Sequence, residues 1–289
     1  KPVCSVTVDF SGVFNAGRVR IINGAAVTLT GNISGSGLSI GVSGAVSPQL
    51  EIGSGSSLTV SISNPFLISV GAGFSGSVAG QITFLNSAHQ LTAQSSSSLV
   101  FTGQAMFKAG TGFSGAPFGT SSQGSVIFSA GTTFQTEAGL PPFGLTAPQS
   151  VVVFQTGSNY LHKSVIPLSL SGRTYSHLTI DAPGLNQEIS LGSLPFVVDN
   201  LNVLNTAMLG IDFPGGTQIR GNILVSAGTL RFNHTGGSVT FSGSGPQSIS
   251  GNGTLLFGNQ CGLIIGSSSN VVLQSDLILG KNLQILTGG

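Results

Sequence analysis

The chain has 289 residues, with nine Lys or Arg, eight Asp or Glu, 44 glycines and a formal net charge of +1. Its charged fraction of 6% and hydrophobic fraction of 40% exclude a disordered chain, because disorder combines low hydrophobicity with high charge. The scattered basic residues exclude a nucleic-acid-binding patch, and the apolar runs of about five residues are far shorter than a membrane helix. We therefore expect neither nucleic-acid binding nor membrane insertion.

Short strands are predicted along the whole chain, and no segment shows the periodicity of an α-helix. The first is an alternating segment that runs from Val3 to Phe10, and the segments before residue 137 are irregular and rich in phenylalanine. A loop at 137–150 (EAGLPPFGLTAPQS) interrupts the strands, because its prolines cannot donate to a strand ladder. Regular apolar triplets follow, and in the last third they start 8, 8, 6 and 6 residues apart, at 255–257, 263–265, 271–273, 277–279 and 283–285.

This rhythm predicts an all-β fold, a right-handed parallel β-helix (β-solenoid) with about three short strands in each coil. The outer residues of each triplet should point into the core and the middle residue outward, because side chains alternate along a strand. We expect one elongated domain over residues 1–289, with a seam or a protruding loop at 137–150.

An internal repeat supports the winding. Residues 178–180 align with 263–265, 189–191 with 271–273, and 200–203 with 282–285, at offsets of 85, 82 and 82 residues. With a coil of about 20 residues, these offsets correspond to about four coils.

Four segments carry a resemblance: residues 153–162 (VFQTGSNYLH), 166–167 (IP), 171–180 (SGRTYSHLTI) and 228–251 (GTLRFNHTGGSVTFSGSGPQSISG). They resemble the β-helical repeat regions of large secreted and surface proteins from Bacteroidota-type bacteria, which are commonly exported by the type IX secretion system. The resemblance covers residues 120–289 and implies an adhesin, sheath material or a passive stalk. The start at Lys1, without Met, fits a mature N-terminus left by cleavage of a signal peptide.

The acidic residues give little support to an enzymatic β-helix such as a pectate lyase, which gathers carboxylates on one sheet face near an Arg or Lys. Asp181 and Asp199 are 18 residues apart, close to one coil, so their spacing leaves a stacked pair open. Arg220 and Arg231, 11 residues apart, would face one groove only by chance. We predict isolated charges at corners and loops, and no catalytic residue, metal or cofactor.

The histidines and cysteines show no spacing typical of a metal site or a catalytic triad. We predict exposed or strand-face positions for His89, His162, His177 and His234. Cys4 and Cys261 lie near opposite ends of the sequence, so we predict two unpaired core residues rather than a disulfide.

Two further binding surfaces have weaker support from the sequence. A sugar-stacking platform would use Tyr160, Tyr175 and the 18 phenylalanines, which we instead predict to form ladders in the core. An ice-binding face needs a regular outward threonine array. Outward threonines occur without a fixed register, at Thr28, Thr30, Thr59, Thr179 and Thr240.

The ends of the predicted solenoid carry the functional prediction. No amphipathic capping helix is predicted at either end, so the strand edges there are expected to be unpaired. A surface with few charges also keeps monomers apart poorly. The predicted assembly residues are Val3, Val6, Val8, Phe10, Leu277, Leu279, Leu283 and Ile285.

We therefore predict a non-catalytic, secreted bacterial structural protein at the cell surface, a subunit of a fibre or filament or a surface adhesin that self-associates. Two alternatives stay open. One is a polysaccharide-binding or polysaccharide-cleaving β-helix of the pectate-lyase type, with a surface polysaccharide as partner. The other is a passive stalk of a larger surface protein.

Overall fold

A computed structural model describes residues 2–41, 46–120, 122–190 and 192–286. These residues form an all-β parallel β-solenoid of about 12 turns with three parallel sheets, as predicted. The chain groups into two compact units, Lys1–Ser158 and Asn159–Gly289. The right-handed winding and the single elongated domain stay predictions. The described part of the chain contains no helix of the length and apolarity needed to cross a bilayer.

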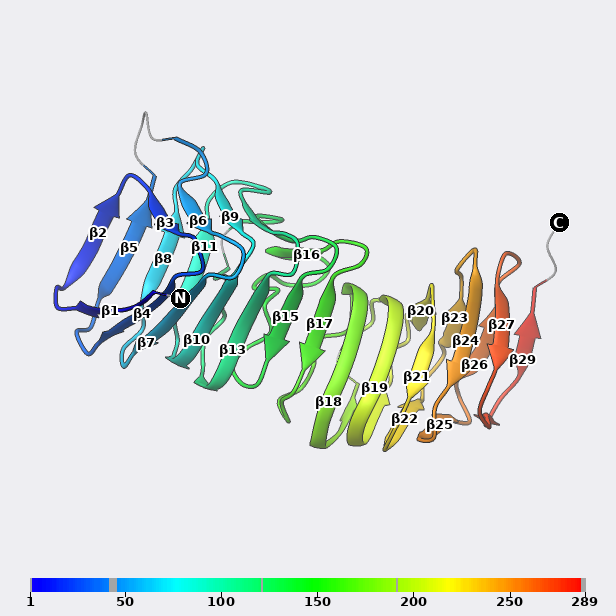
Figure 1. The fold of residues 1–289 in the computed structure, drawn as a ribbon. Coiled ribbons are helices and arrows are strands. Elements are labelled where there is room, and N and C mark those ends of the chain that lie inside the picture. The colour runs from blue at the N-terminus through cyan, green and yellow to red at the C-terminus, as the bar shows by residue number, and fades with distance from the viewer. Residues whose placement is uncertain (1, 42–45, 121, 191, 287–289) are drawn as a thin grey trace. The chain divides into compact units, whose positions relative to one another are not determined.

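The first unit winds through three columns of parallel strands (Figure 1). The first column contains β1 (Val3–Val8), β4 (Ala26–Gly31), β7 (Ser57–Ile62), β10 (Gln81–Ser87), β13 (Met106–Phe113) and β15 (Thr133–Thr136). The second contains β2 (Gly12–Ala16), β5 (Ser36–Ile40), β8 (Leu67–Val70) and β11 (Gln90–Ala93). The third contains β3 (Val19–Ile21), β6 (Leu50–Ile52), β9 (Gly76–Val78), β12 (Leu99–Phe101), β14 (Val126–Phe128) and β16 (Val152–Phe154).

The second unit begins with β17 (Asn159–His162) and two strands of 16 residues, β18 (Thr174–Ile189) and β19 (Phe196–Ile211). The long β19 pairs with three separate strands of the next coil, β20 (Thr217–Ile219), β21 (Ile223–Val225) and β22 (Thr229–Phe232). The following coils contain β23 (Ser238–Phe241), β24 (Pro246–Ser250) and β25 (Thr254–Phe257), then β26 (Gly262–Ile265), β27 (Asn270–Leu273) and β28 (Ile278–Leu279), and finally β29 (Leu283–Ile285).

The register of these strands corrects the internal repeat. Leu178 pairs with Leu201, Leu201 with Ile223, and Ile223 with Ile249, so one coil takes 22 to 26 residues here. Leu263 belongs to another column, because it pairs with Val239 of β23. The alignment of 178–180 with 263–265 is therefore wrong. Triplets of different columns resemble one another, so sequence similarity alone joined two columns that do not stack.

The alternation within triplets is confirmed. In β6, β12 and β21 the two outer residues are buried and the middle one is partly exposed. β14 differs, because all three of its residues are buried. The loop at 137–150 contains no strand, and Phe143 within it is 2% exposed and lies with its ring edge against Phe154, at a centroid distance of 6.0 Å.

Aromatic ladders fill the core. In the first unit Phe101 stacks on Phe128 with ring centroids 4.4 Å apart, and Phe107 stacks on Phe134 at 5.6 Å. In the second unit Tyr160 and Tyr175 are buried and meet edge to face at 5.2 Å. Such rings bury large apolar areas and gain from their mutual geometry. The core ladders of phenylalanine are as predicted, and the two tyrosines are also core residues that offer no ring face to a sugar.

Truncating a side chain inside an aromatic ladder should lower the free energy of unfolding strongly. Truncating an outward side chain of the same strand should lower it little. Phe101→Ala removes a fully buried ring, so we expect it to lower the free energy of unfolding by about 3–5 kcal/mol. Val100→Ala, on the outward position of β12, should cost about 1 kcal/mol or less. Urea denaturation followed by circular dichroism measures both. Equal losses for the two variants would contradict the assigned core face.

Candidate functional site

In the first coil, some side chains on the core-facing side of the strands are exposed to solvent. Val6 pairs with Leu29, which pairs with Val60. Val60 is fully buried, but Val6 is 43% exposed, because among the described residues β1 pairs along one edge only, with β4. Val8 on the same face is 5% exposed, since it lies near the end of the strand where the chain turns.

The other predicted residues of this coil lie differently. Val3 pairs with Ala26, which pairs with Ser57, so Val3 belongs to the outward face, where it is 79% exposed. Phe10 is half-buried, and its ring lies 6.1 Å from that of Phe14. The structure does not test their role in assembly.

Phe14 was missed by the sequence reasoning. It pairs with Leu38, which pairs with the buried Ile68, so it faces the core, and yet it is 57% exposed. The apolar, polar, apolar order of Phe14, Asn15 and Ala16 is the signal that could have found it. The open side of the first coil therefore includes β2 as well as β1.

The last strands show the same contrast. Leu283 and Ile285 of β29 pair with Leu263 and Ile265, and the exposed fraction rises from 2% at Leu263 to 50% at Leu283. Ile285 is 66% exposed, and Leu277 and Leu279 are half-buried.

Leu273 of β27 belongs to this open face too, although it was not predicted. It is 55% exposed, whereas its partner Ile249 is 1% exposed. An apolar hollow of about 300 Å³ lies here, lined by core-facing residues of β24, β26, β27 and β29 together with Leu277. Core-facing rows thus end at an open surface in each unit.

Cys4 lies on the core-facing side of β1, opposite in orientation to its neighbours Val3 and Ser5, but it is exposed. Cys261 is buried. Both thiols are free. The prediction of two unpaired cysteines is confirmed, and their placement in the core is right for Cys261 and wrong for Cys4. Cys4 is exposed for the same reason as Val6, the open edge of β1.

The charged residues are not isolated. Arg20 pairs in register with Glu51 and donates to it at 2.6 Å, and Arg18 donates to the same carboxylate at 3.0 Å. Hydrogen bonding by Arg20 lowers the pKa of Glu51. Four more pairs join different coils: Lys108 with Glu137 at 2.7 Å, Lys163 with Asp181 at 3.1 Å, Arg220 with Asp199 at 3.9 Å, and Arg231 with Glu188. The prediction of isolated charges is wrong for these residues, because residues in one outward row lie only about 4.8 Å apart from coil to coil.

Asp181 and Asp199 do not stack. Asp181 pairs with Asn205, whereas Asp199 accepts a hydrogen bond from Ser176 at 2.9 Å and lies 3.9 Å from Arg220. Arg220 and Arg231 therefore contact different carboxylates. Within the described residues no group of three or more His, Cys, Asp or Glu could hold a metal ion. The absence of catalysis stays a prediction.

Three of the four histidines are buried. His162 lies on β17 and His177 on β18, which fits the predicted strand-face positions, whereas His89 and His234 are buried in turns, where the prediction is wrong. The Nδ1 atom of His89 accepts the backbone N–H of Phe66 at 3.1 Å, and Nδ1 of His234 accepts that of Phe213 at the same distance. Each histidine therefore joins its own turn to the coil before it. His162 is 2% exposed, and His177 is half-buried beside Asn200.

The outward threonines of the first unit have a register, contrary to the prediction. Thr28 pairs with Thr59 and Thr59 with Thr83, so they form one row across three coils. Thr30 pairs with Ser61 in the next row. Thr179 and Thr240 of the second unit pair with Asn202 and Gln218, so no threonine row forms at those positions.

No protein-family model, curated protein or solved structure matches this chain. The β-solenoid is therefore known from the structure itself. The resemblance to bacterial surface repeats continues to rest on the sequence segments that carry it.

The buried histidines predict acid sensitivity. Burial lowers the pKa of His89, His162 and His234 to about 4, against 6.5 in an unfolded chain. Between these two pKa values the unfolded state binds more protons than the folded state. The contribution of the neutral, buried histidines to the free energy of unfolding is therefore complete above pH 6.5 and is lost as the pH falls toward 4. Each histidine should contribute about 3 kcal/mol of this loss.

The free energy of unfolding, measured by urea denaturation at a series of pH values, tests this. The slope of the free energy of unfolding against pH gives the number of protons taken up on unfolding. Between pH 6.5 and 4 this number should be smaller by one in the variant His234→Gln, because Gln does not titrate. A stability that stays flat over this range would contradict the burial of the three side chains.

Proposed function

We propose that this chain is a non-catalytic extracellular structural protein, a subunit of a surface fibre or adhesin that self-associates through the open edges of its coils. The supporting observation is the abrupt exposure of core-facing rows: Val60 against Val6 in the first unit, and Ile249 against Leu273 in the second. The resemblance in residues 120–289 supports export to the surface of a Bacteroidota-type bacterium.

Both backbone and side chains favour association at an open strand edge. An open strand edge presents unpaired N–H and C=O groups that another strand can satisfy. The apolar side chains beside it gain about 25 cal/mol for each Å² removed from water. In a parallel solenoid the first coil of one copy can continue the last coil of another, since both present the same kind of edge.

The surface offers little electrostatic resistance to such contacts. The net charge is +1, and the carboxylates of Glu51, Glu137 and Asp181 each lie against a cation of the same unit. A net charge near zero favours association.

A polysaccharide-cleaving β-helix receives less support. Cleavage needs an acid and a base within reach of one bond, whereas Asp181 and Asp199 contact separate partners on different rows. A passive stalk is the remaining alternative. It predicts that the purified chain does not associate through its open edges.

The test introduces one charge into the core-facing row of the first coil. Val6→Asp should weaken self-association by about tenfold or more, because a carboxylate cannot be buried against apolar side chains without a partner. Thr7→Asp is the matched control, since Thr7 lies next to Val6 on the outward face and is exposed. Sedimentation velocity over a concentration series gives the association constants, and negative-stain microscopy shows the assemblies.

Leu283→Asp and Gln284→Asp form the equivalent pair on β29, where Leu283 faces the core and Gln284 faces outward. Wild-type protein that stays monomeric at high concentration would refute the proposal and favour the stalk. Equal effects at Val6 and Thr7 would show that assembly does not use the core-facing row.

A further inference from the structure

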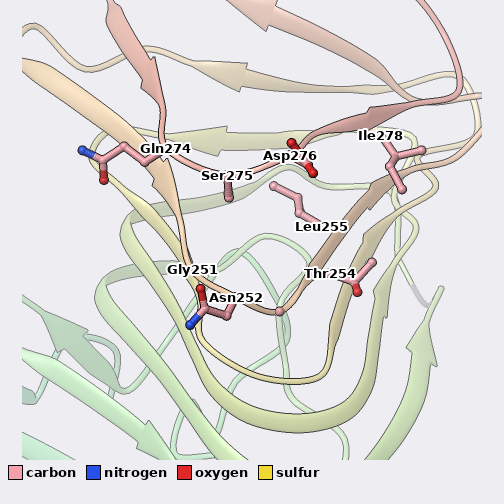
Figure 2. A pocket seen from close by; sticks show the side chains of 9 residues that line it. Gly251, Asn252, Thr254, Leu255, Gln274, Ser275, Asp276 and Ile278 are labelled. Carbon is pink, nitrogen blue, oxygen red and sulfur yellow. The ribbon is translucent and has the colours of Figure 1, made fainter.

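A polar hollow lies between two successive coils of the second unit. Ile249 pairs with Leu273, and Leu256 pairs with Ile278. Between these two pairs the lower coil has six residues, 250–255, and the upper coil has only four, 274–277. The upper arc is shorter and does not cover the whole lower arc. The uncovered part of the lower arc leaves a cavity of about 460 Å³ (Figure 2).

The floor of this cavity is fixed by the coil below it. Gly253 donates its N–H to the carbonyl of Val225 at 2.7 Å, and Thr254 donates to that of Gly228 at 2.8 Å. Gly251 has a φ of +117°, and a Cβ atom there would meet the Val225 carbonyl oxygen at 2.0 Å. On the upper arc, Gln274 donates its N–H to Ile249 at 2.8 Å. The hollow is therefore preformed by backbone contacts.

The lining side chains are mostly neutral and polar. Asn252 and Thr254 stand on the lower arc, and Gln274, Ser275 and Asp276 on the upper arc, as Figure 2 shows. Ile278, which is 56% exposed, adds an apolar side chain to the rim, while Leu255 is buried beneath the floor. No Lys, Arg or His belongs to the described lining, and Asp276 is its single carboxylate.

We propose that this hollow binds a neutral saccharide unit. A sugar hydroxyl both donates and accepts hydrogen bonds, which matches amides and hydroxyls that do both. The Asp276 carboxylate accepts from two hydroxyls and repels anionic sugars, while the exposed Ile278 can contact the C–H face of a ring. The volume falls within the range of about 300–1,000 Å³ typical of small-ligand pockets.

A calcium ion fits this lining less well than a saccharide. Calcium takes about 6–8 oxygen ligands and relies on several carboxylates, whereas Asp276 is the lone acid among the lining residues. The proposal goes beyond self-assembly and does not depend on it, because the hollow lies within one chain.

Isothermal titration calorimetry of the full chain tests the proposal with neutral trisaccharides (cello-, manno-, xylo- and N-acetylchito-oligosaccharides) and with anionic trigalacturonate. We expect binding of at least one neutral probe and weaker or no binding of trigalacturonate. Asp276→Ala and Asn252→Ala should each weaken that binding by about tenfold or more. Asn259→Ala, at an exposed turn outside the hollow, is the matched control and should leave the affinity unchanged.

Two results would overturn the proposal: no binding of any neutral probe, or binding that Asp276→Ala and Asn252→Ala leave unaltered. Circular dichroism and the thermal midpoint of each variant establish that it is folded. Asn252→Ala, on the lower arc, should self-associate like wild type, and Val6→Asp should bind saccharide like wild type. Failure of the saccharide site and failure of self-assembly are thus separate outcomes.

Discussion

Parallel backbone hydrogen bonding between successive coils is the constraint on which the rest of this structure depends. Once Leu178 pairs with Leu201 and Leu201 with Ile223, every other residue of these strands is fixed in a row with a neighbour about 4.8 Å away. Apolar rows then form the core ladders. Outward rows bring together residues such as Arg20 and Glu51, which are far apart in sequence.

In a repetitive structure, side chains lack a covering neighbour where the repeat ends in the described chain or changes its length. Val6, Phe14, Leu273 and Leu283 lie in the same rows as buried residues one or two coils away, and they are exposed because nothing in the described chain covers them. A change of arc length has a similar effect within the stack. The short arc at 274–277 leaves part of the arc at 250–255 uncovered and creates the polar hollow.

Side chains also supply bonds where the strand ladder is interrupted. His89 and His234 lie in turns and accept a backbone N–H from the preceding coil, so they satisfy a donor that no strand reaches. This arrangement requires the neutral imidazole, because a protonated ring has no acceptor left. The same contacts that hold two turns in place at neutral pH therefore make them sensitive to acid.

The sequence by itself determined the strands, their inward and outward faces, and the β-solenoid. These features depend on alternation within a few residues, as in β6 or β21. Only the tertiary structure decided which strand lies on which, that Glu51 meets Arg20, that His234 is buried, and that Asn252 and Asp276 line one hollow. Each of these depends on the length of a whole coil, which varies from 22 to 26 residues in the column of Leu178. A difference of one or two residues in a turn changes which side chains meet, and short apolar triplets are too alike to reveal it.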